Sequence, residues 1–70
     1  MIFYDYLIRV TNEEGIHADF AYDAIRDEDF PKDVETWEKL ELYLISKRAD
    51  SAARHVAKEL LRDFMRLKKG

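Results

Sequence analysis

The most prominent group of residues that could do chemistry is a run of carboxylates in the middle of the chain. Its members are Asp27, Asp29, Asp33, Glu35 and Glu38. Their spacing imitates the oxygen ligands of a calcium-binding loop. Such a loop needs a glycine at its sharp turn, but Lys32 stands there, and Pro31 replaces a side-chain ligand. Because a lysine would put a positive charge beside the ion, the sequence favours a solvated junction between two helices over a calcium site.

A second group combines a histidine with nearby carboxylates, which are residue types that bind zinc. Asp19 and Asp23 are one helical turn apart and share a face, whereas His17 points to another side of the same helix. Two ligands on one face do not complete a zinc site. We therefore expect a partly buried histidine near the start of a helix, and no metal ion.

A third group has the residue types of a hydrolase triad. His55 follows Ser51 by one helical turn, and Asp50 precedes Ser51. Catalysis by a triad also needs preorganised donors for the oxyanion, and a small helical bundle has little room for a pocket. The sequence therefore favours helix capping by Asp50 and Ser51, and we expect neither enzymatic activity nor a cofactor.

A row of cations marks the C-terminal part of the chain. Arg54, Lys58, Arg62 and Arg66 recur every four residues, which places them along one face of a helix. Such a row could meet the phosphates of a nucleic acid with salt-sensitive affinity. The chain as a whole is acidic, with a pI of about 5.3, and its acidic helices would repel a polyanion. Nucleic-acid binding through this row is therefore the alternative hypothesis.

The charges are divided unevenly along the chain. Residues 1–44 hold 12 acidic and 4 basic side chains, a balance of −8, and residues 45–70 hold 3 acidic and 8 basic side chains, a balance of +5, which together give the net charge of −3. The two blocks either form separate binding faces or pair with each other inside the fold. The predicted protein-binding surface is acidic and consists of Asp19, Asp23, Asp27 and Glu28.

Helices must position all of these residues, because each periodic segment repeats at the helical period and none alternates as a strand does. The inward residues are predicted to be Phe3, Tyr6, Leu7 and Val10 in a first helix and His17, Phe20, Ala21, Ala24 and Ile25 in a second. Gly15 lies in the turn between them. Thr11 with Glu14 matches a capping box for the second helix, although Asn12 could cap it instead.

A break in the helical pattern separates the second helix from the third. Pro31 has no N–H and pushes Phe30 out of the helical region, so the second helix is predicted to end near Glu28 or Asp29. Phe30 is a large apolar residue in this break. We expect it to fill the core between the flanking helices.

Two further helices complete the predicted bundle. Asp33 or Thr36 can cap the third helix, and Asp50 can cap the fourth, which covers about residues 51–67. Their inward residues are predicted to be Trp37, Leu40, Tyr43 and Leu44, and then Ala53, Val56, Ala57, Leu60, Phe64 and Leu67. The residues expected to hold the fold together are Phe3, Phe20, Phe30, Pro31, Trp37, Leu40, Leu44 and Phe64.

Three blocks of sequence now agree with a known family in residue type and interval. They are Phe3-Tyr4-x-Tyr6-Leu7, Phe20-Ala21-x-x-Ala24-x-x-Asp27-x-x-Phe30-Pro31-Lys32 and Trp37-x-x-Leu40-x-x-Tyr43-Leu44. Over roughly residues 2–45 the chain resembles the YozE-like family of small bacterial proteins. The resemblance implies a single domain over residues 1–70 with a sterile-alpha-motif-like (SAM-like), all-α fold of four or five short helices. It implies no activity, and the last helix departs from the family because it has Ala57, Leu61 and Phe64 where larger rings are frequent.

Size and composition set the remaining expectations. The 70 residues suffice for one domain, and they contain no cysteine. The first residues do not look like a signal peptide, and no apolar run is long enough to span a membrane. We expect a soluble, cytoplasmic monomer or weak dimer that does not bind membranes. Its predicted function is that of a small interaction module, a protein-binding adaptor or regulator whose partner is another protein.

Overall fold

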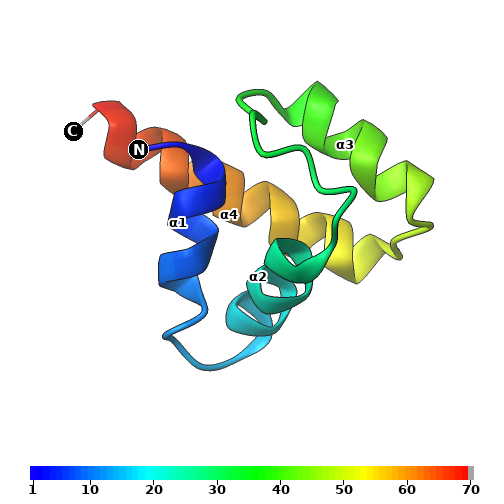
Figure 1. Cartoon of the computed structure of the whole chain (residues 1–70), viewed down its shortest axis with the longest axis horizontal. Coiled ribbons are helices and arrows are strands. Elements are labelled where there is room, and N and C mark those ends of the chain that lie inside the picture. Colours follow the sequence, from blue (N-terminus) through cyan, green and yellow to red (C-terminus); the bar gives the residue numbers. More distant parts are fainter. Residues whose placement is uncertain (70) are drawn as a thin grey trace.

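The longest helix, α4 (Ser51–Lys69), runs through the structure, and the other three helices pack against it (Figure 1). The computed structural model describes residues 1–69, and these contain α1 (Phe3–Val10), α2 (Ile16–Arg26), α3 (Trp37–Ser46) and α4. Helices α1 and α2 also pack on each other, whereas among these four helices α3 packs on α4 alone. The predicted all-α bundle is confirmed, with four helices in the described residues.

The apolar face predicted for α1 is present. Phe3, Leu7 and Val10 are buried, and Tyr6 is half-buried beside them. The capping box predicted for α2 is wrong. Helix α2 begins after Gly15, whose φ of 102° turns the chain, and no side chain caps it. Thr11 instead ends α1, and its hydroxyl donates a hydrogen bond to a carbonyl of that helix.

Small side chains form the buried face of α2. Ala18, Ala21 and Ala24 are buried, so α1 and α4 can approach the helix closely. The sequence predicted Ala21 and Ala24 but missed Ala18, and its prediction of a partly buried His17 agrees with the half-buried side chain. Phe20 and Ile25 are half-buried at the edge of the core.

The break between α2 and α3 carries Phe30 into the core, as the sequence predicts. Phe30 is only 3% exposed, and its ring lies edge-on to Tyr43 with the centroids 4.9 Å apart. The rings of Phe3 and Tyr4 lie on its other sides. Helix α2 ends at Arg26, slightly before the predicted end, because the backbone turns at Asp27, whose carbonyl accepts a hydrogen bond from Phe30 N.

The caps predicted for the last two helices are confirmed. The hydroxyl of Thr36 accepts a hydrogen bond from Lys39 N at 3.3 Å, while Asp33 pairs with the Lys39 side chain instead. Asp50 Oδ1 accepts a hydrogen bond from Ala53 N at 2.8 Å at the start of α4. Helix α4 extends to Lys69, two residues past its predicted end at residue 67.

One predicted core residue of α4 is wrong. Leu67 is 56% exposed, and Leu61, which was not among the predicted inward residues, is 5% exposed. Leu67 belongs to the last turn of α4, and that turn extends past the neighbouring helices (Figure 1). A periodic stripe gives the orientation of a helix but not the point at which its neighbours end.

We predict that Phe30→Ala destabilises the fold by about 3–5 kcal/mol, because it removes a buried ring and leaves a cavity. Urea unfolding followed by circular dichroism measures this loss. The control is Leu42→Ala on α3, where the side chain is 68% exposed, and its effect should stay within about 0.5 kcal/mol. A loss for Phe30→Ala below about 1 kcal/mol would contradict the central role of this ring.

Candidate functional site

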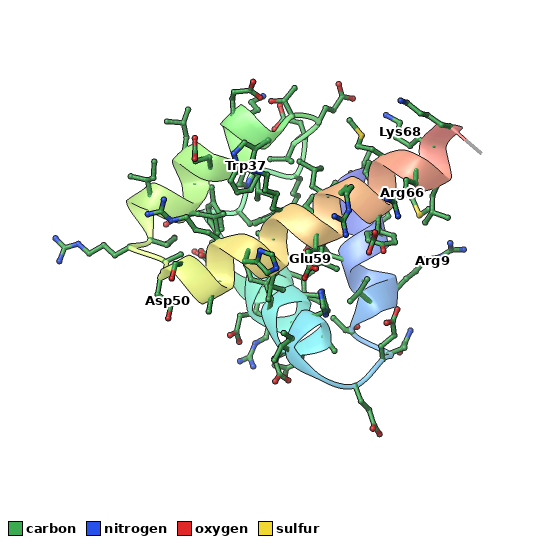
Figure 2. The ribbon with its side chains drawn as sticks, turned by 180° about the vertical axis from the view of Figure 1, so that it is seen from behind. Arg9, Trp37, Asp50, Glu59, Arg66 and Lys68 are labelled. Atoms are coloured by element: carbon green, nitrogen blue, oxygen red, sulfur yellow. The ribbon has the colours of Figure 1, made fainter. Side chains whose placement is uncertain are left out.

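A groove of about 570 Å³ opens between the N-terminal end of α3 and one face of α4. Trp37 forms the wall on the α3 side, and Leu61 and Met65 lie on the α4 side. In Figure 2, Trp37 lies beside the middle of α4, and Arg66 lies further along α4 toward its C-terminal end. The full lining consists of Glu35, Thr36, Trp37, His55, Lys58, Glu59, Leu61, Arg62, Met65, Arg66 and Lys69.

Cations follow the α4 edge of this groove. Lys58, Arg62 and Arg66, three of the four cations that the sequence singled out, line it, and Lys69 extends their row by a further turn. All four are exposed. Arg54, the remaining member of the predicted row, is exposed on the same helix but does not line the groove.

The groove cations are not neutralised by the acidic half of the chain. The Lys58 ammonium lies 5.4 Å from the centroid of the Trp37 ring. Arg62 and Arg66 approach Asp63 at 3.9 and 4.0 Å, which is the outer limit of an ion pair between exposed groups. Within residues 1–69, the ion pairs between the two charge blocks involve Lys47 and Glu59 and none of these groove cations. The row therefore faces solvent.

Asp27, one residue of the predicted acidic surface, forms contacts with other residues of the protein. Its Oδ2 accepts a hydrogen bond from the Tyr43 hydroxyl at 2.5 Å and lies 3.2 Å from the Lys47 ammonium. Its Oδ1 accepts from Asp29 N at 2.9 Å. These contacts, the Tyr43 hydroxyl first among them, hold the pKa of Asp27 below its usual range. Burial, followed by the bond to Asp27, raises the pKa of Tyr43.

The other members of the predicted acidic surface lie elsewhere on the molecule. Asp19 and Asp23 are exposed on α2, and Glu28 is exposed in the turn after it. They do not line the groove between α3 and α4. Three carboxylates of the acidic surface are therefore exposed. The fourth, Asp27, connects the end of α2 to α3 through its hydrogen bond with Tyr43.

Both histidines of the chain lie against a single carboxylate, which sequence reasoning missed. His17 Nε2 is 3.0 Å from Glu59 Oε1, and His55 Nε2 is 3.6 Å from Glu59 Oε2. His17 thus pairs across the interface of α2 and α4, and not with Asp19 or Asp23. The partners are 42 residues apart, so no local pattern could indicate the contact. No group of three or more residues suited to a metal ion occurs among residues 1–69.

Comparisons with known proteins give one positive result. A family model described as the YozE SAM-like fold matches residues 2–66. It describes SAM-like domains of unknown function. No curated protein and no solved structure matches the chain. In the part of the chain that the structure describes, no helix is long and apolar enough to cross a membrane.

The lowered pKa of Asp27 generates a prediction about acid stability. Its folded pKa lies below the unfolded value of about 3.9, so its contribution to stability is present above that pH and is lost as the pH falls through the folded pKa. Asp27→Asn should lower the urea midpoint at neutral pH, and its difference from the wild type should shrink as the pH falls through the folded pKa of Asp27.

The matched control is Glu28→Gln, which changes the neighbouring carboxylate. Glu28 is exposed and forms no hydrogen bond or ion pair with any other residue among 1–69. Its substitution should leave the pH profile unchanged. An Asp27→Asn variant with an equal deficit at every pH would show that the charge of Asp27 contributes nothing.

Proposed function

Because the chain belongs to the YozE SAM-like fold family, which fixes the fold and assigns no reaction, we propose that it is a non-catalytic protein-binding module. In this proposal it acts as an adaptor or regulator in the cytoplasm, as a monomer or weak dimer. Its partner docks in the groove between α3 and α4. The observation that supports this proposal is the combination of an apolar lining with cations that have no partner in the acidic half of the chain.

The lining has the residue types that favour protein interfaces. Tryptophan and arginine are enriched among the residues that contribute most to binding energy, and the groove has Trp37 beside Arg62 and Arg66. Met65 is 36% exposed, and the flexible thioether side chain of methionine can adapt to the shape of a partner. Of the predicted acidic surface, Asp23 and Asp27 line a smaller groove of about 250 Å³, whose one cation is Lys47.

Affinity capture from the native lysate tests this proposal with the intact chain. We expect the wild type to retain a protein after nuclease treatment, and the double variant Arg62→Glu/Met65→Glu to lose it. The matched control is Asp19→Lys/Asp23→Lys on α2, which should retain the partner. Circular dichroism must show that both variants are folded, since each changes only exposed positions.

The opposite pattern would contradict docking in the groove. If the α2 variant loses the partner and the groove variant retains it, the acidic surface is the binding site and the proposal is wrong about the location. Loss of the captured material on nuclease treatment would instead favour the second candidate function.

That second candidate is nucleic-acid binding along α4, and the exposure of Arg54, Lys58, Arg62 and Arg66 is the observation that favours it. A labelled single strand of about 20 nucleotides should then bind at low salt and dissociate as salt rises. The variant Arg54→Gln/Lys58→Gln/Arg62→Gln should abolish the change in fluorescence anisotropy. If the wild type does not bind at low salt, this candidate fails.

A further inference from the structure

The apolar lining of the groove is arranged at helical spacing. Leu61 and Met65 are one turn apart on α4, so their side chains lie one behind the other along its face, and Trp37 faces them from α3. Leu61 forms the deep part of this lining, since it is 5% exposed, while Met65 is accessible from outside. A row of this kind is complementary to an apolar stripe on another helix.

The cations run parallel to that row. Lys58, Arg62, Arg66 and Lys69 span twelve residues of α4, which corresponds to roughly 16 Å or three helical turns. The acidic residues of the lining are Glu35 and Glu59, two carboxylates against four cations, and Glu59 lies 3.0 Å from His17 and 3.6 Å from His55. The groove therefore has an excess of positive charge although the whole chain has a net charge of −3.

Other modes of recognition use these features less completely. A strand that adds to a sheet edge needs a strand, and residues 1–69 contain none. A nucleic-acid strand could use the cations, but it would leave Met65, which is 36% exposed, without an apolar partner. A nucleic-acid base would have to stack on the Trp37 ring in the wall of the groove. The Lys58 ammonium already lies over that ring.

We infer that the occupant of this groove is an acidic amphipathic helix of another protein, about three turns long. Its apolar stripe packs on Trp37, Leu61 and Met65. Its carboxylates face Arg62, Arg66 and Lys69. This inference rests on the proposed function, because it names the chemistry of the partner that binds in the same groove.

Selection from a random peptide library on phage tests the inference without knowledge of the partner. The library displays peptides of about 16 residues, which is enough for three turns and flanking residues. It is selected on the wild-type protein and depleted on the folded Arg62→Glu/Met65→Glu variant. We expect the enriched peptides to carry a net negative charge and apolar residues at the i, i+3, i+4 and i+7 positions.

The strongest selected peptide is then synthesised and titrated. Trp37 is the only tryptophan of the chain and lies in the groove wall, so its fluorescence reports occupancy. Arg62→Glu/Arg66→Glu should raise the dissociation constant by about tenfold or more, because both charges are reversed at the contact. The matched control Arg54→Glu reverses a charge of the same helix outside the groove, and it should change the constant by less than about twofold.

Several outcomes would overturn the inference. These are enrichment of basic or uncharged peptides, the absence of any enrichment on the wild type, and equal effects of Arg54→Glu and Arg62→Glu/Arg66→Glu. Concentration-dependent self-association that blocks the groove would identify a second copy as the occupant and would also overturn it. The two proposals fail separately: if the lysate partner is lost with the groove variant but contains no acidic helix, the docking site stands and only the inference is wrong.

Discussion

The packing of Phe30 is the interaction on which the arrangement of the helices depends. Helix α3 packs on α4 and on neither of the other two helices of the described chain, so its position relative to α1 and α2 relies on the connection that precedes it. Phe30 brings that connection into the core, where it contacts Phe3 of α1 and Tyr43 of α3. The bond from Tyr43 to Asp27 fixes the same point from the polar side. Aromatic packing and a charged hydrogen bond thus act on one turn of α3.

This anchor and the groove lie at opposite ends of α3. Tyr43 and Lys47 belong to the C-terminal end of α3 and its cap, where Asp27 and Asp29 hold them, and the short turn to α4 follows directly. Trp37 is at the other end of α3, where it lies beside the middle of α4 (Figure 2). Side chains of α4 from His55 to Lys69 line the groove on its other side. The groove therefore opens at the end of α3 that is opposite to the contacts with Asp27 and Asp29.

The sequence predicts features that depend on neighbouring residues and misses those that depend on distant ones. Pro31 dictates the break, and Thr36 and Asp50 cap the helices that follow them, because each acts within a few residues. The pairing of His17 with Glu59 depends on how α2 and α4 meet, which no local pattern encodes. The cation row on α4 is visible in the sequence, but the groove beside it is not, since that groove requires the placement of Trp37.

The net charge of a small domain says less about its partners than the local arrangement of its charges. Asp27 and Asp29 hold Lys47, and Glu59 lies between the two histidines, so several acidic groups act within the fold. The cations along the groove take no part in these ion pairs, so they are available to solvent or to a partner. Over distances longer than about 8 Å, salt at physiological strength screens the remaining acidic surface, while contacts inside the groove are screened less. In such a groove the apolar lining would supply most of the affinity, and the cation row would fix orientation and select against basic segments. An acidic domain can therefore bind an acidic helix, provided that the helix also carries the apolar stripe that Leu61 and Met65 would cover.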